Sequence, residues 1–147
     1  IYTLEGKKFF AFGGASSHDI SDGILDGKDE KWKEKAKKLE KEGKYRFRVK
    51  GLSWWEEELP TEEEMENGRK NLEKNQYQVD FILTHSPSAS MIALLGRGLY
   101  EQDILTKYLE EIRQKMEYRK WFMGHMHLNY AMNDKDILLY EQIVRLN

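Results

Sequence analysis

Three short, mainly apolar runs constrain the fold of this 147-residue chain more than any other feature. They occupy positions 7–12, 79–84 and 120–123, and they stop at a glycine pair, a His-Ser-Pro sequence and a Gly-His-Met-His sequence. An apolar run that ends at such residues is typical of a buried strand entering a tight turn. Residues 136–146 are expected to add a further strand or two. Because helical patterns separate these strands and the length suits a single core, we expect an α/β domain.

Two of the helical patterns have clear bounds. Thr61 and Glu64 form a Thr-x-x-Glu capping box, which predicts a helix over 61–75. Between 101 and 116, apolar side chains recur at helical spacing and predict an amphipathic helix with one buried face. That face consists of Ile104, Leu105, Tyr108, Leu109, Ile112 and Met116.

The segment 28–50 is rich in lysine and has a pattern of its own. Trp32, Ala36 and Leu39 are spaced by four and then three residues, which predicts a surface helix over 28–42 with one narrow apolar stripe. Residues 45–49 alternate apolar and basic side chains, as a half-exposed strand does.

Composition limits the chemistry that the chain can carry. It has no Cys, so any metal must be bound by His, Asp, Glu, Asn or water, and a reducing, cytoplasmic location is expected. The net charge of −2 argues against a general nucleic-acid or membrane binder. Segment 28–50 is basic and 56–66 is acidic, and such blocks usually solvate neighbouring surfaces; a patch that binds a partner or nucleic acid is the alternative. No run has the length of a membrane span, and no signal-peptide pattern occurs, so no membrane partner is expected.

Three of the four histidines directly follow predicted strands. His85 follows one strand, and His125 and His127 follow another. Ligand sites of α/β folds lie beyond the carboxyl ends of strands, so the imidazoles are expected to converge if the two strands are neighbours. In an extended segment, residues two apart project from the same face, so His125 and His127 could reach one metal or an adjacent pair. Gly124 would leave room for a close approach. The alternative is an accidental surface pair.

Two further places carry weaker signals. His18 and Asp19 follow the glycine pair in a loop, where Asp19 suits an ordering role and His18 is either solvent-facing or a ligand. Trp54 and Trp55 form a large apolar element in a polar region. We expect them to be buried as core, and a platform for substrate stacking is the alternative.

Four short motifs occur in a fixed order along the chain. They are Phe12-Gly13-Gly14-Ala15 with Ser17 and Asp19, Ser53-Trp54-Trp55 with Glu58, the strand that ends in Thr84-His85, and the segment 121–127 with its Gly-His-x-His sequence. Together and in this order, over most of the chain, they resemble the C-terminal portion of the calcineurin-like metallophosphoesterases.

The resemblance implies a four-layer α/β/β/α sandwich with a two-metal centre at the strand ends. It assigns His85 and His125 to one metal and His127 to the other, with Mn, Fe or Zn as the ions. The implied reaction is hydrolysis of a phosphate-ester substrate by a water that two cations activate. Asp19, His18 and Gly14 are the candidates for substrate or loop positions.

The sequence also departs from the family. The Asp-x-His, Gly-Asp-x-x-Asp and Gly-Asn-His-Asp/Glu motifs, which supply the bridging carboxylate, the Asn ligand and the catalytic His, do not occur in these residues. Three imidazoles alone do not neutralise two adjacent dications. We therefore expect 1–147 to be the C-terminal portion of a single domain, with 28–50 as a possible surface insertion and no catalytic residue of its own. The N-terminal half of the domain or an oligomeric partner would complete it. The alternative is a degenerate, non-catalytic module that binds a partner.

Overall fold

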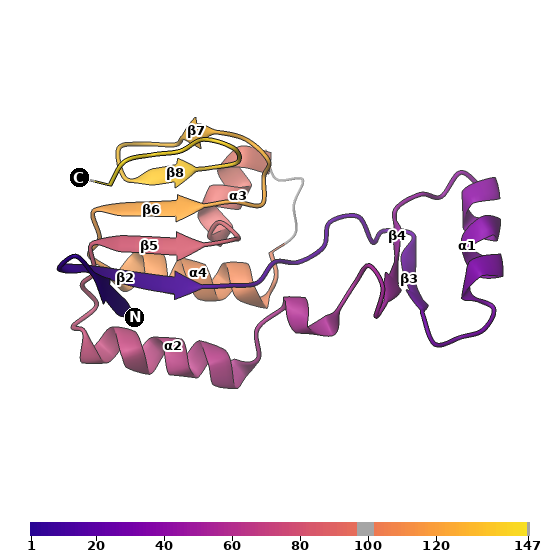
Figure 1. Ribbon diagram of the computed structural model, residues 1–147, viewed down its shortest axis with the longest axis horizontal. Coiled ribbons are helices and arrows are strands. Elements are labelled where there is room, and N and C mark those ends of the chain that lie inside the picture. Colours follow the sequence, from indigo (N-terminus) through magenta and orange to yellow (C-terminus); the bar gives the residue numbers. More distant parts are fainter. Residues whose placement is uncertain (97–101, 147) are drawn as a thin grey trace. The chain divides into compact units, whose positions relative to one another are not determined.

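Strands and helices are interspersed along the chain in the computed structural model, which describes residues 1–96 and 102–146 (Figure 1). The expected α/β class is confirmed: the described residues form a mixed sheet and four α-helices. The chain divides into two units, which are described separately. Unit 1 comprises 1–15 and 60–147, and unit 2 comprises 16–59. Among the described residues, none of the helices combines the length and the apolar character needed to cross a bilayer.

Unit 1 is built on a six-stranded sheet with the order β1-β2-β5-β6-β8-β7. The four central strands β2, β5, β6 and β8 are parallel, and β1 and β7 are antiparallel at the two edges. Figure 1 shows the four central arrows pointing the same way, so their carboxyl ends lie along one edge of the sheet. The strands are β1 (Tyr2–Leu4), β2 (Lys7–Phe12), β5 (Phe81–Thr84), β6 (Lys120–Met123), β7 (Tyr130–Ala131) and β8 (Asp136–Leu138).

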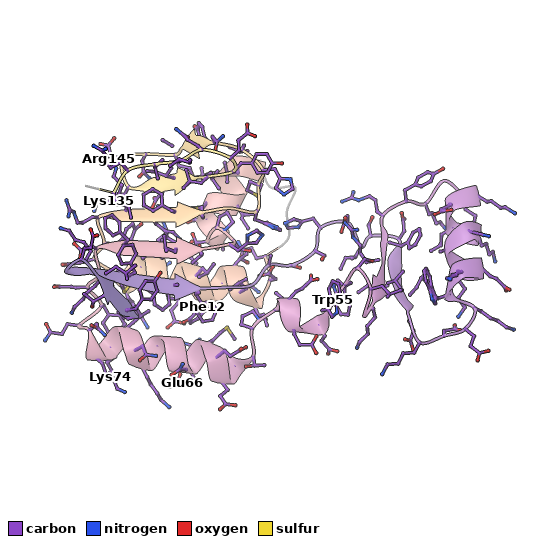
Figure 2. All side chains as sticks on the ribbon, viewed as in Figure 1. Phe12, Trp55, Glu66, Lys74, Lys135 and Arg145 are labelled. Carbon is purple, nitrogen blue, oxygen red and sulfur yellow. The ribbon has the colours of Figure 1, made fainter. Side chains whose placement is uncertain are left out.

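One face of this sheet packs against the helices. Asp136 of β8 accepts a hydrogen bond of 3.0 Å from Arg113 of α4, and the Phe12 ring of β2 lies 4.8 Å from the Tyr108 ring of α4. Phe12 lies at the carboxyl end of β2, and Glu66 and Lys74 project from α2 into solvent (Figure 2). The helices of unit 1 are α2 (Glu62–Lys74), α3 (Ala89–Gly96) and α4 (Ile104–Lys115).

The other face carries a cluster of three buried aromatic side chains. Phe9, Phe81 and Phe122 form this cluster on β2, β5 and β6. Four partly buried apolar residues pack against it, namely Leu83, Ile137, Leu139 and Val144. The sheet of unit 1 therefore has an apolar layer on both faces. The four-layer sandwich stays a prediction.

Local signals place most elements of unit 1 correctly. The strands at 7–12 and 120–123 are confirmed, and the capping box is confirmed because Thr61 Oγ1 accepts a hydrogen bond from the Glu64 amide. The helix expected from 101 begins at Ile104, where Asp103 caps it, and position 101 lies outside the described residues. The other apolar residues of the expected face are buried, namely Leu105, Tyr108, Leu109, Ile112 and Met116.

One expectation for unit 1 is wrong in part. Ile104 is 52% exposed, so it lies beside the buried face of α4 and not on it. Residues 136–146 supply one strand, β8, as expected, and this strand ends at Leu138. After that point the Tyr140 amide donates to the Asn129 side chain at 2.8 Å, which takes it out of the sheet ladder. The sequence patterns also miss β1, β7 and α3.

Unit 2 contains a two-stranded parallel sheet and a crossover helix. β3 (Gly23–Asp26) pairs with β4 (Phe47–Lys50), and α1 (Trp32–Lys41) connects them. Ala36 of α1 and Val49 of β4 are buried. The short 3-10 helix η1 (Glu56–Glu58) follows. The expected helix and strand in 28–50 are thus present, each starting later than predicted.

The expectation that Trp54 and Trp55 are core is wrong. Trp55 is 46% exposed, and Trp54 is only half-buried with the Lys50 ammonium 5.8 Å from its ring. A two-stranded sheet with one helix has too little apolar surface to enclose two adjacent indoles.

Candidate functional site

The candidate site lies at the carboxyl edge of the unit 1 sheet, defined here as positions 13–14, 85–86, 124–129 and 139–140. These segments follow β2, β5, β6 and β8 respectively. β5 and β6 are adjacent parallel strands with Thr84 opposite Met123. The two loops that carry histidines therefore leave the sheet side by side, as the sequence predicts.

His85 and His125 come together at this edge. The Nε2 atom of His85 lies 3.3 Å from the Nδ1 atom of His125, and the ring centroids are 5.2 Å apart at an angle of 71°. The Gly124 amide donates to the His85 carbonyl at 2.9 Å, which ties the two loops together. Two imidazole nitrogens thus face each other across the gap between two strand ends.

His127 lies differently from the expectation. The backbone is not extended after β6, because His125 and His127 both have positive φ, of 68° and 50°. The Met126 amide donates to the Gly124 carbonyl at 2.8 Å and closes a tight turn. The His127 ring stacks on Tyr140, with ring centroids 5.0 Å apart and ring planes 24° apart. The argument from alternating extended residues is therefore wrong, and His127 makes its contact with the end of β8.

The positive φ angles of His125 and His127 indicate that contacts around the loop hold it in shape. Residues other than glycine rarely adopt positive φ, although His does so more readily than most residues. Such conformations persist only where surrounding contacts hold them, and they cluster at functional sites. Two of them in one loop of six residues mark 124–129 as a segment with a fixed, unusual shape.

A chain of hydrogen bonds holds the start of the β5 loop. The buried Trp121 indole donates to Thr84 Oγ1 at 2.8 Å, and that hydroxyl donates to the Ser86 carbonyl at 2.7 Å. Ser86 Oγ then donates to the Gly14 carbonyl at 3.2 Å. This chain fixes the residues on both sides of His85, and it places the candidate Gly14 beside the β5 loop through its backbone.

The candidates Asp19 and His18 belong to unit 2. Arg48 Nε donates to Asp19 Oδ1 at 2.9 Å, and Arg48 Nη2 contacts Asp19 Oδ2. The hydrogen bonds from Arg48 lower the pKa of Asp19 below its usual value, against a smaller opposing effect of burial. Arg46 donates to the His18 carbonyl at 2.6 Å. Asp19 thus orders its own loop in unit 2.

The histidine pair fits part of a metal site. Two nitrogens bound to one tetrahedral ion at about 2.05 Å lie roughly 3.3 Å apart, which equals the separation of His85 Nε2 and His125 Nδ1. Within 1–96 and 102–146, no group of three His, Asp or Glu side chains could hold a metal ion. The pair therefore fits two ligands of one cation. The remaining ligands, and any carboxylate that bridges two cations, would have to come from elsewhere.

Tyr140 and Asn129 are parts of the edge that sequence reasoning missed. A usable signal exists for Tyr140, because it follows a short apolar strand just as His85 does.

No protein-family model matches the chain, and neither a curated protein nor a solved structure matches it. Inference about function therefore rests on the carboxyl edge and on the sequence motifs.

Proposed function

We propose that this chain is part of a metal-dependent phosphoric-ester hydrolase of the calcineurin-like metallophosphoesterase type, with its metal site at the carboxyl edge of unit 1. The observation that carries the proposal is the pair of facing imidazole nitrogens of His85 and His125, 3.3 Å apart. The Gly-His-x-His loop supports it, since the two histidines there have left-handed backbones.

Each histidine has a definite role in this proposal. His85 and His125 bind one divalent cation through neutral ring nitrogens, and His127 is the candidate ligand of a second. Bound cations of this kind, Mn, Fe or Zn, supply a water of lowered pKa and a clamp for the phosphoryl oxygens. The Trp121, Thr84 and Ser86 hydrogen bonds hold His85 in place for that task.

The bridging carboxylate and the catalytic groups are proposed to come from outside these 147 residues. The proposed fold is accordingly one half of the four-layer sandwich. The face that carries Phe9, Phe81 and Phe122, against which Leu139 and Val144 pack here, is the one that a second sheet is proposed to cover. The 147-residue chain alone is expected to hydrolyse phosphate esters barely or not at all.

The first experiment measures metal binding, because catalysis needs the other half. Isothermal titration of the 147-residue chain with Zn²⁺ is expected to give one site, which His85→Ala and His125→Ala each weaken at least about tenfold. Tyr130→Ala is the control; this tyrosine is 53% exposed on β7 and is expected to leave the affinity unchanged. A wild-type chain that binds no Zn²⁺, or variants that bind as tightly as wild type, would overturn the proposal.

The second experiment tests the hydrolase itself. Adding the N-terminal half of such a domain in trans, with Mn²⁺, is expected to produce hydrolysis of p-nitrophenyl phosphate that His125→Ala abolishes. Tight association without hydrolysis would instead identify a partner-binding module, which is the alternative function.

A further inference from the structure

Tyr140 is an aromatic residue at the candidate site for which the proposed function has no role. It follows β8 at the carboxyl edge, and its ring lies on the His127 imidazole with centroids 5.0 Å apart and planes 24° apart. Tyr140 is 59% exposed, and His127 is exposed as well. Burial therefore does not force the two rings together, and their contact is a specific one.

The backbone around Tyr140 is joined to both ends of the histidine loop. At the base of the loop, the Leu139 amide donates to the Met123 carbonyl at 2.8 Å. At the far end, the Tyr140 amide donates to Asn129 Oδ1 at 2.8 Å. The exit of β8 thus brackets 124–129 at both ends, and the Tyr140 ring adds the contact to a side chain within it.

The loop needs such contacts. His127 has a φ of 50°, a conformation that residues other than glycine keep only where neighbours hold it. An exposed imidazole would otherwise rotate about its side-chain bonds and lose entropy on binding a ligand. Stacking on the ring of Tyr140, whose backbone is held by hydrogen bonds, restricts that rotation beforehand.

We propose that Tyr140 is a positioning residue: its ring stacks on His127 and fixes the orientation of that imidazole for a divalent cation. This inference rests on the proposed function, and it adds to it a residue from a different strand. The face of the Tyr140 ring orients His127 by stacking on it, and the phenol hydroxyl is not needed for this.

The first test needs no metal. In an NMR spectrum of the 147-residue chain, the His127 ring protons are expected upfield of their free position, because they lie over the Tyr140 ring. Tyr140→Phe is expected to keep this shift, and Tyr140→Ala to abolish it. Tyr130→Ala, a tyrosine of similar exposure on the same sheet, is expected to leave it unchanged. Absence of the shift in the wild-type chain would overturn the inference.

The second test is a double-mutant cycle on the affinity for the second Zn²⁺, the ion assigned to His127, measured with the N-terminal half of the domain added in trans. Residues that orient a metal ligand typically change affinity 10–100-fold, so Tyr140→Ala is expected to weaken binding by about that factor and Tyr140→Phe by less than about twofold. The H127A/Y140A double variant is expected to bind as weakly as H127A alone, because Tyr140 acts through His127. Circular dichroism confirms that each variant is folded.

The outcomes separate this inference from the proposed function. Unchanged affinity for the second Zn²⁺ in Tyr140→Ala, together with a weakened first site in His85→Ala, overturns the inference and leaves the function standing. Equal losses in Tyr140→Ala and Tyr140→Phe would assign the effect to the hydroxyl and also overturn it. A wild-type chain without Zn²⁺ affinity overturns both.

Discussion

Polar side chains differ in burial and in hydrogen bonding between the helix-facing interior and the carboxyl edge of the same sheet. In the interior, Asp136 is 2% exposed, and its carboxylate accepts hydrogen bonds from Arg113, Tyr118 and Asn133. At the edge, His85 is exposed and its Nε2 faces another imidazole nitrogen.

This difference suggests that the interior groups act mainly on folding stability and the edge groups mainly on ligand binding. Every interior acceptor bonded in this way contributes to folding, because a buried group that loses its partners is costly. The pair of exposed His85 and half-buried His125, 3.3 Å apart, contributes less to folding than such an interior network, and we propose that it binds a cation. We therefore expect interior substitutions to change the free energy of unfolding and edge substitutions to change metal affinity.

The largest effect is expected at Asp136. Asp136→Ala removes the acceptor of the Arg113 guanidinium and of the Tyr118 and Asn133 side chains, and leaves those donors partly buried without it. Breaking one side of such a network costs about 3 kcal/mol. Urea unfolding measures the loss, and Asp136→Asn, which keeps the shape, is the milder companion. A loss below about 1 kcal/mol in Asp136→Ala would contradict the expectation that interior substitutions act on the free energy of unfolding.

The next effect is expected where α2 meets α4. A Cβ added at Gly68 would overlap the Tyr108 hydroxyl, so Gly68→Ala forces the ring to move. Overpacking costs about 1–3 kcal/mol, whereas replacing a helical glycine by alanine gains about 1 kcal/mol. Gly68→Ala is therefore expected to destabilise by about 1 kcal/mol.

Tyr108→Phe is the matched control for that clash. In the described part of the chain, the buried Tyr108 hydroxyl has no hydrogen-bond partner, and burial raises its pKa. Removing it is expected to cost nothing, and Gly68→Ala in the Tyr108→Phe background is expected to be neutral or stabilising. Equal costs of Gly68→Ala in both backgrounds would contradict the clash.

A third prediction concerns acid stability in the interior. Burial alone would raise the pKa of Glu110, but hydrogen bonds from Ser90 and Ser88, with the charge of Arg113, bring it below its ordinary value. A lowered pKa means that the carboxylate stabilises the fold above pH about 4.5 and loses this effect as the pH falls through the folded-state pKa. Glu110→Gln is expected to cost about 1 kcal/mol at pH 7 and less near pH 3. A cost that does not depend on pH, measured by urea unfolding at both values, would contradict this.

Local signals explain which features sequence reasoning reached. The strand at 120–123 and the Thr61 cap depend on residues within a few positions of each other, so the sequence predicts both of them. The meeting of His85 and His125 follows from one general rule about parallel strands.

The features that were missed depend on distant partners. α3 is apolar on nearly all sides, and the groups at its N-terminus bind Glu110 of α4 rather than a residue of its own. The stack of His127 on Tyr140 depends on left-handed backbone at 125 and 127. Neither position is a glycine, so the sequence contains no signal for this conformation. Sequence patterns give no account of a conformation that tertiary contacts impose.

Gly124 gives the smallest expected effect and the finest test of the edge. The sequence suggests that this glycine is needed for a close approach, yet an added Cβ would lie 3.4 Å from His85 Nδ1, in ordinary contact. Gly124→Ala is therefore expected to change the unfolding free energy by less than about 0.5 kcal/mol and Zn²⁺ affinity by less than about threefold. Gly124→Val, which brings branched atoms toward the same ring, is the graded companion and should weaken binding further. A tenfold loss in Gly124→Ala would mean that the imidazole pair tolerates no lateral contact, and that the edge is as closely packed as the interior.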